Sequence, residues 1–366
     1  MTFTDFQPRA GCLTAAILLT SMTACGPLPG FEVLNKDDNF DQIVSINDKV
    51  DILFVIDNSG SMGEEQLTLT ESFTSFIDQF RSRNLNFQIG VISTDVQTDP
   101  DWWTGTGAWL RVSGWGFFGQ SGSGTLVGLG ANPRLLTPNT PNLVQTFQEN
   151  ARLYTYGWFE EAGILAAYKA LSPERLAVGA ANEGLVRDDA LLAVVVLSDE
   201  DESVGDMSSQ LQDYIRNYPA LRAQRVSDFA ERFRSLKPDR PDLLRFDAII
   251  APSAAECPTG LPGGEGEVYA EVAGMFRGTV SNICQDFSAH LVKIGSDLVN
   301  LLTSFKIKQK PAGPITVIVD DVVVPENAEN GWQFDEPTLV ISFHGTSVPK
   351  ADAKIKVNYV PSAPLK

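Results

Sequence analysis

Short apolar runs that end in acidic residues constrain the fold of this chain more than any other feature. Residues 51–56 (DILFVI) and 191–197 (LLAVVVL) are apolar almost throughout and rich in β-branched side chains. Such runs are typical of parallel strands that are covered on both faces. Residues 87–93 (FQIGVIS) and 244–251 (LRFDAIIA) predict two further strands.

Segments with helical periodicity separate these strands. In residues 64–83, for example, Phe73, Phe76 and Phe80 recur at helical spacing. Further helices are predicted at residues 143–154, 162–171, 207–217, 226–236, 268–277 and 289–304. Because strands and helices alternate, the sequence predicts an α/β fold, with a doubly wound, mostly parallel sheet covered by helices on both faces.

Two regions depart from this alternation. Residues 102–130 are rich in Gly, Trp, Ser and Phe and show no periodicity, which predicts an insertion within a main domain of residues 46–304. Its tryptophans suit a surface for a partner or a glycan, and equally suit local packing that holds the insertion together. Residues 305–366 consist of short β-type runs between Pro, Gly and Asn turns, and predict a small C-terminal antiparallel β module.

The N-terminus predicts export. Arg9 precedes an apolar stretch at residues 11–24 that is too short to span a membrane in the mature protein. The stretch ends in "MTAC" and resembles a bacterial lipoprotein signal, with residues 1–24 as the signal peptide and residues 25–45 as a tether. The resemblance implies that Cys25 is acylated and anchors the protein in the membrane, and Gly26 after it implies the outer membrane. A plain secretory signal with an incidental cysteine is the alternative.

The remaining cysteines follow from this compartment. The chain has four, of which Cys12 leaves with the signal and Cys25 carries lipid. Cys257 and Cys284 are left as a pair in an oxidising compartment, where we expect a disulfide that contributes roughly 3 kcal/mol. Two buried free thiols are the alternative.

Charge and motif content exclude several classes of function. The net charge is −18, with 28 Lys and Arg against 46 Asp and Glu, so nucleic acid is not an expected partner. The sequence has no G-x-x-x-x-G-K-[ST] motif for nucleotide phosphates, and its two histidines, His290 and His344, do not suggest a Ser-His-Asp hydrolase. The sequence therefore predicts a protein that is not an enzyme.

Oxygen-bearing side chains stand where two predicted strands end. Asp57, Ser59 and Ser61 follow residues 51–56, and Asp199 follows residues 191–197. Ligands of open α/β sheets bind beyond the carboxyl ends of the strands. If the two strands are neighbours, these four side chains meet and offer hard oxygen donors to Mg²⁺, or to Mn²⁺ or Ca²⁺.

The stretch "DNSGSM" resembles the metal-ion-dependent adhesion site of the von Willebrand factor type A domain, whose motif D-x-S-x-S it matches at Asp57, Ser59 and Ser61. "LSDED" resembles the later loop of that family and puts its second aspartate at Asp199. The family usually adds a threonine from an intermediate loop, but Trp158 stands in that place. Glu161 is the expected substitute ligand, with Glu160 and Thr155 as alternatives.

The resemblance implies a binding function. In the family, the metal presents an open coordination position to a carboxylate of a partner protein. We therefore expect an envelope-anchored, metal-dependent binding protein of adhesion type. The alternative is a structural component of the envelope in which the metal is a closed brace capped by Glu161. The remaining acids of the run Asp199–Glu202, with Asp206, are expected to form a solvated loop.

Overall fold

The computed structural model describes most of the chain. It covers residues 40–44, 47–96, 124–128, 130–155, 161–203, 211–251 and 265–362, with only the backbone at residues 40–44, 211–218 and 287. Several sequence predictions lie outside the described residues: the signal peptide, Cys25, most of the tether and of the insertion, Glu160, Asp206 and Cys257.

The central sheet has six strands in the order β4-β3-β2-β5-β6-β7. Five are parallel, namely β2 (Lys49–Ile56), β3 (Asn86–Ser93), β5 (Leu191–Ser198), β6 (Leu244–Ile250) and β7 (Val280–Asn282). The two-residue strand β4 (Leu135–Leu136) pairs with β3 in the antiparallel direction. The predicted fold class, a mostly parallel α/β sheet, is confirmed.

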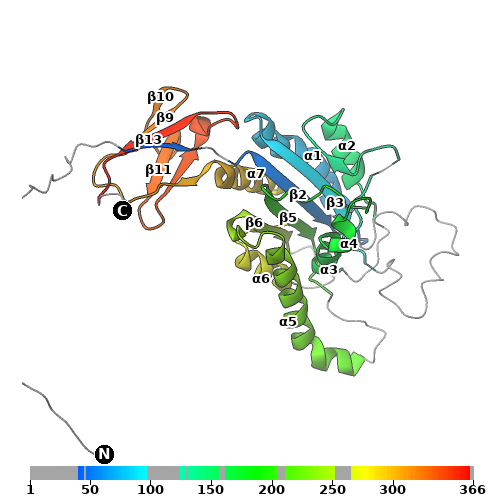
Figure 1. Cartoon of the computed structure of the whole chain (residues 1–366). Helices are drawn as coiled ribbons and strands as arrows, with labels where there is room; N and C mark the ends of the chain where they lie inside the picture. Colours follow the sequence, from blue (N-terminus) through cyan, green and yellow to red (C-terminus); the bar gives the residue numbers. More distant parts are fainter. Residues whose placement is uncertain are drawn as a thin grey trace, which may run out of the picture. The chain divides into compact units, whose positions relative to one another are not determined.

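Helices cover both faces of this sheet (Figure 1). One face packs against α1 (Gly63–Arg81), α2 (Leu143–Ala151) and α7 (Phe287–Thr303), and the other against α3 (Gly163–Ala170), α5 (Leu211–Ser235) and α6 (Glu267–Met275). Along β2, Ile52, Phe54 and Ile56 face the first set, while Leu53 and Val55 face the second. Because both faces are covered, residues 52–56 of the strand are apolar without alternation.

Two short helical turns complete this domain. They are α4 (Pro173–Leu176) and a 3₁₀ turn at Pro241–Leu243. The described parts of the two helices predicted at residues 207–217 and 226–236 belong to the single helix α5, which runs through Pro219. The gap predicted between them, at residues 218–225, is therefore wrong, although a proline removes one helical hydrogen bond.

The C-terminal β module is confirmed as a pair of small antiparallel sheets. Its strands are β8 (Phe305–Lys306), β9 (Thr316–Val319), β10 (Val322–Val324), β11 (Gly331–Asp335), β12 (Val340–His344) and β13 (Ile355–Tyr359), with a 3₁₀ turn at Gly345–Ser347. A core that includes Trp332, Phe343 and Tyr359 holds them together.

The N-terminal segment contributes a strand to this module. Strand β1 (Phe40–Val44) pairs with β13, from Phe40 opposite Tyr359 to Val44 opposite Ile355. These five residues fall within the segment predicted as a tether, and their partner lies more than 300 residues away in sequence. A pairing over such a separation leaves no local signal in a five-residue stretch.

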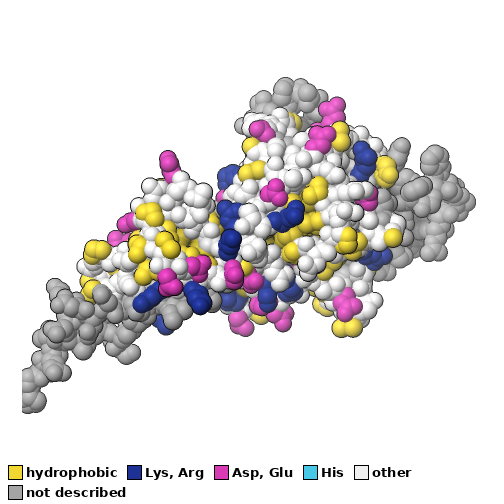
Figure 2. Space-filling model, turned by 90° about the horizontal axis from the view of Figure 1, so that it is seen from above, with side chains coloured by type: hydrophobic (Ala, Val, Ile, Leu, Met, Phe, Trp, Pro, Cys, Tyr) yellow, Lys and Arg dark blue, Asp and Glu magenta, His cyan; other side chains and the backbone are white. Residues whose placement is uncertain are grey.

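Among the described residues, no helix is both long and apolar enough to cross a membrane. Cys284 is disulfide-bonded, but Cys257 is not among the described residues, so the pairing of the two stays a prediction. Figure 2 shows one face of the molecule, on which Lys and Arg side chains lie among Asp and Glu side chains. Charges of both signs are therefore interspersed on this face, although the net charge of the chain is negative.

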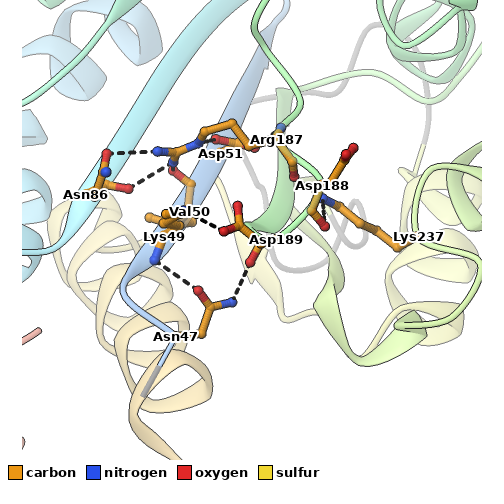
Figure 3. A network of polar contacts seen from close by, with 9 residues as sticks. All are labelled: Asn47, Lys49, Val50, Asp51, Asn86, Arg187, Asp188, Asp189 and Lys237. Atoms are coloured by element: carbon orange, nitrogen blue, oxygen red, sulfur yellow. Dashed lines mark hydrogen bonds and ion pairs between the residues drawn. The ribbon is translucent and has the colours of Figure 1, made fainter. Parts of the chain in front are cut away.

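A buried ion pair ties the first half of β2 to the loop that precedes β5 (Figure 3). The carboxylate of Asp51 is fully buried and accepts hydrogen bonds of 2.7 Å from both the backbone N–H and the Nε of Arg187. The same guanidinium donates to the carbonyl oxygens of Val50 and Asn86, and Lys237 donates to the carbonyl of Arg187. Burial raises the pKa of Asp51 to about 6, although the bonds and the charge of Arg187 lower it.

We predict that Arg187→Met destabilises the protein by about 3–5 kcal/mol at pH 7.5, because it leaves the carboxylate of Asp51 buried without its main partner. Without the guanidinium the pKa of the buried Asp51 rises further, so the variant takes up a proton at a higher pH than wild type does, and the loss should be smaller at pH 5 than at pH 7.5. Urea unfolding at pH 5 and 7.5 measures both values. The control is Lys49→Met, which removes a more exposed pair with Asp189 and should destabilise the protein much less. Equal losses in the two variants would contradict the prediction.

Candidate metal site

The candidate site lies at the carboxyl ends of β2 and β5. These strands are direct neighbours, with Ile56 opposite Leu197, and the backbone N–H of Asp57 continues the pairing with a 2.9 Å bond to the carbonyl of Leu197. The condition on which the sequence prediction depended is therefore met. Since β3 flanks β2 on the other side, the site is at the point where the strand order reverses.

Hydrogen bonds bring the four predicted side chains into one cluster. The carboxylate of Asp57 accepts from the backbone N–H of Ser59 at 2.7 Å, and the hydroxyls of Ser59 and Ser61 lie 3.1 Å apart. The hydroxyl of Ser61 in turn donates to Asp199 Oδ1 at 3.1 Å. Asp57 is fully buried, whereas Ser61 is exposed, so the cluster reaches from the sheet to solvent.

Glu161 lies deep in the same region and is 1% exposed. Thr94, the residue after β3, donates its hydroxyl to Glu161 Oε2, while the buried Oε1 has no hydrogen-bond partner. The pKa of Glu161 is raised well above its ordinary value, first by burial and next by the charge of Asp57. Glu161 is thus close enough to Asp57 for the charge of Asp57 to raise its pKa, and its Oε1 is free to bind a cation.

The two alternatives to Glu161 are less well supported. Thr155 lies beside the start of α1, where its methyl carbon would be 3.5 Å from a Cβ atom built on Gly63. No hydrogen bond joins Thr155 to the cluster in the part of the chain that the structure describes. Glu160 and Trp158 are outside that part.

The carboxyl groups of the site disfavour one another's ionisation. Burial raises the pKa of Asp57 to about 6; the hydroxyl of Ser198, which donates at 2.6 Å, and the N–H of Ser59 lower it, while the charge of Asp199 raises it. The pKa of Glu200 rises to about 7 through burial and the charges of Asp57 and Asp199. The charges that raise the pKa of Asp57 and Glu200 are those of neighbouring carboxylates, so a cation at this place would relieve the repulsion.

Sequence reasoning missed three groups around the site. Thr94 and Ser198 come directly at the ends of β3 and β5, and the rule that identified Asp57 and Asp199 could have found them. Gln66, on the first turns of α1, donates to the carbonyls of Asp57 and Tyr154 at 2.9 and 3.0 Å. Nothing in the sequence marks this glutamine, because its role depends on the chain segment after α2.

The prediction of a solvated loop after Asp199 is wrong for Glu202. Its carboxylate is 1% exposed and accepts hydrogen bonds from the first turn of α3. Asp201 is partly buried and accepts from the backbone N–H of Val268 at the start of α6. Both carboxylates satisfy helix N–H groups that have no partner within the helix.

The donor set fits a small hard cation in its chemistry. Among the described residues, no group of three or more His, Cys, Asp and Glu side chains is placed to hold a metal ion by itself. The cluster instead combines two carboxylates, Asp57 and Asp199, with the hydroxyls of Ser59 and Ser61. The buried Oε1 of Glu161, which has no hydrogen-bond partner, is the observation that most favours a cation bound at this place.

No protein-family model and no curated protein matches the chain. Among solved structures, it is similar to proximal thread matrix protein 1 from the mussel byssus with a zinc-occupied MIDAS motif, at 11% identity and a TM-score of 0.37, covering 73% of this chain and 51% of that one. It is also similar to the pilus adhesin SpaC from Lactobacillus rhamnosus GG (12%, TM-score 0.40, 90% and 41%) and to the pilus adhesin RrgA from Streptococcus pneumoniae (9%, TM-score 0.33, 90% and 60%). The chain thus spans 41–60% of the length of these proteins, and similarities at this level define neither a family nor a function for it.

We predict that Asp57→Asn makes the metal-free protein more stable at neutral pH. The folded-state pKa of Asp57, about 6, lies above the ordinary value of 3.8, so the folded protein holds a proton that the unfolded chain has released between these values. Stability contributed by Asp57 therefore falls as the pH rises through this window. In EDTA, wild type and variant should be similar near pH 4, and the variant should gain on the order of 3 kcal/mol by pH 8. Urea unfolding across this range tests the prediction, and a difference that does not grow with pH would contradict it.

Proposed function

We propose that this chain is a non-enzymatic protein of the bacterial cell envelope that binds a partner protein through a divalent cation. The observation that carries the proposal is the convergence of Asp57, Ser59, Ser61 and Asp199 in one hydrogen-bonded cluster at the edge of the sheet. The match to the D-x-S-x-S motif supports it. The bonds among these side chains are the ones that a cation would replace.

The charge balance supports a cation at this place. Asp57 and Asp199 provide carboxylates and Ser59 and Ser61 provide hydroxyls, which are ligands of Mg²⁺, Mn²⁺ or Ca²⁺. Burial raises the pKa of Asp57 and of Asp199, so each aspartate is costly to ionise without a compensating charge. When bound, the cation would supply a Lewis-acidic position for a carboxylate of the partner.

Exposure indicates on which side the partner would approach. Gly60 and Ser61 are exposed, whereas Asp57 and Glu161 are buried. The motif loop therefore opens to solvent at Ser61, and Glu161 would hold the cation from within. The lipid anchor at Cys25 and the outer membrane belong to the same proposal, which the sequence signal supports.

A closed structural brace is the second candidate. The observation in its favour is the buried, unpartnered Oε1 of Glu161, which would complete the ligand set without any partner. In that case the protein would be a component of an envelope or surface assembly, and other surfaces would make its contacts.

We predict that Mg²⁺ or Mn²⁺ stabilises the purified protein and that Asp57→Ala abolishes the effect. A cation at about 100 times its Kd should add roughly 2.7 kcal/mol to the free energy of unfolding. Thermal melting in Mg²⁺, Mn²⁺, Ca²⁺ and EDTA measures it, with Arg187→Met as a destabilised control that keeps the site and should still respond. If no ion shifts the melting of wild type, the metal hypothesis is lost for both candidates.

The two candidates differ in the water bound to the cation. An open site keeps an exchangeable water where the partner carboxylate would bind, and we expect Mn²⁺ bound to the protein to enhance water-proton relaxation strongly. Glu161→Gln should weaken Mn²⁺ binding but keep this enhancement per bound ion. A weak enhancement in wild type that rises in Glu161→Gln would identify a closed brace capped by Glu161, and would contradict the proposed partner-binding role.

A further inference from the structure

We propose that Glu202 is a positioning residue that holds Glu161 and Asp199 in place around the same cation. The inference rests on the proposed cation site and assigns a role to a residue that does not itself belong to the ligand cluster. It starts from the loop Asp199–Ser203, which directly follows the end of β5.

Three carboxylates of this loop accept hydrogen bonds, each from a different element. Asp199 accepts from Ser61 in the motif loop, Asp201 accepts from Val268 at the start of α6, and Glu202 accepts from α3. The loop therefore bonds to the loop of Ser61, to α6 and to α3, and through Arg225 also to α5, rather than extending into solvent. Of the helices that this loop binds, α3 is the one that begins next to a candidate metal ligand. Its first residue, Gly163, is two positions after Glu161.

Helix α3 depends on tertiary contacts for the hydrogen bonds of its first turn. Its N-cap residue, Ala162, has no side chain that can accept a bond. The N–H groups of Ile164 and Leu165 donate instead to the two carboxylate oxygens of Glu202, at 2.7 and 3.1 Å, and that of Gly163 donates to the hydroxyl of Tyr269 at 3.2 Å. A carboxylate at this end of a helix also interacts favourably with the helix dipole.

The residue next to Glu202 binds Glu161 itself. The backbone N–H of Ser203 donates to the carbonyl of Glu161 at 2.5 Å. On its other side, Ala162 donates its N–H to the carbonyl of Thr94 at 3.3 Å, and Thr94 also donates to the side chain of Glu161. Glu202 and Ser203, which are adjacent in the loop Asp199–Ser203, thus bind the backbone after and before Ala162, respectively. Glu161 cannot shift without breaking these bonds.

An arginine compensates the charge of Glu202 at this position, although burial raises the pKa of its carboxyl. Arg225, on α5, forms an ion pair with Glu202, whose side chain is fully buried. The carboxylate therefore has three donors for its two oxygens, and its position is determined by α3 and α5 together. Glu202 is also only three positions after Asp199 in the same loop. Its bonds therefore restrain Glu161 through α3 and Asp199 through the loop backbone.

The test compares two variants of the same loop. Glu202→Gln keeps the shape of the side chain but removes the charge that bonds α3 and Arg225, whereas Asp201→Asn makes the same change at the carboxylate that anchors α6. Isothermal titration of the purified protein with Mn²⁺ alone measures the Kd. We expect Glu202→Gln to raise the Kd roughly tenfold or more, as changes to groups that orient metal ligands do. Asp201→Asn should leave the Kd within about twofold.

A readout that does not depend on the cation accompanies the titration. In EDTA, hydrogen exchange at the amides of Ile164 and Leu165 should accelerate in Glu202→Gln and stay unchanged in Asp201→Asn. If Glu202→Gln does not fold, Arg225→Met replaces it, because it removes the ion pair and leaves the bonds to α3. This variant should raise the Kd by a smaller factor, about threefold.

The outcomes separate the inference from the proposed function. If wild type gives no heat with Mn²⁺, the proposed cation site fails and the role of Glu202 fails with it. If wild type binds Mn²⁺ and Glu202→Gln binds it equally well, or if Asp201→Asn weakens binding to the same extent, only the positioning role is overturned.

Discussion

The parallel pairing of β2 with β5 is the interaction on which the rest of this structure depends. It places the residue after β2 beside the last residue of β5, and the bond from the N–H of Asp57 to the carbonyl of Leu197 fixes this register. A shift of one residue would turn Asp57 and the side chains before it to the opposite faces of the sheet. The two aspartates of the site are 142 positions apart in sequence, and this pairing is what brings their loops together.

The fold class could be predicted because burial leaves a strong signal in the sequence. A strand covered by α1 and α7 on one face and by α3 and α5 on the other favours consecutive apolar residues, as at residues 52–56. Features that depend on distant partners left no such signal. Strand β1 exists because Ile355–Tyr359 offers it a partner, and the continuation of α5 through Pro219 opposes a local rule that usually holds.

The same distinction between local signals and distant contacts applies to the candidate site. Asp57, Ser59, Ser61 and Asp199 carry a spacing and a position at strand ends that identify them. Glu202 could not be assigned in this way, because a glutamate in an acidic run resembles a solvated residue until α3 is placed against it. Residues that bind a ligand are marked by local pattern, whereas residues that hold those ligands in place are marked only by the tertiary contacts they make.

Two buried aspartates, Asp51 within β2 and Asp57 directly after it, show how differently this fold treats negative charge. Burial raises the pKa of both Asp51 and Asp57 to about 6. At Asp51 the opposing influence is a guanidinium, so the charge is compensated within the chain. At Asp57 it consists of hydrogen bonds from Ser198 and Ser59, while the like charge of Asp199 raises the pKa further. Hydrogen bonds to neutral donors compensate a buried carboxylate less than an ion pair does. Asp51 within the strand therefore has a cationic partner in the chain, whereas no positive charge acts on Asp57 among the described residues, and a cation from solution could supply one.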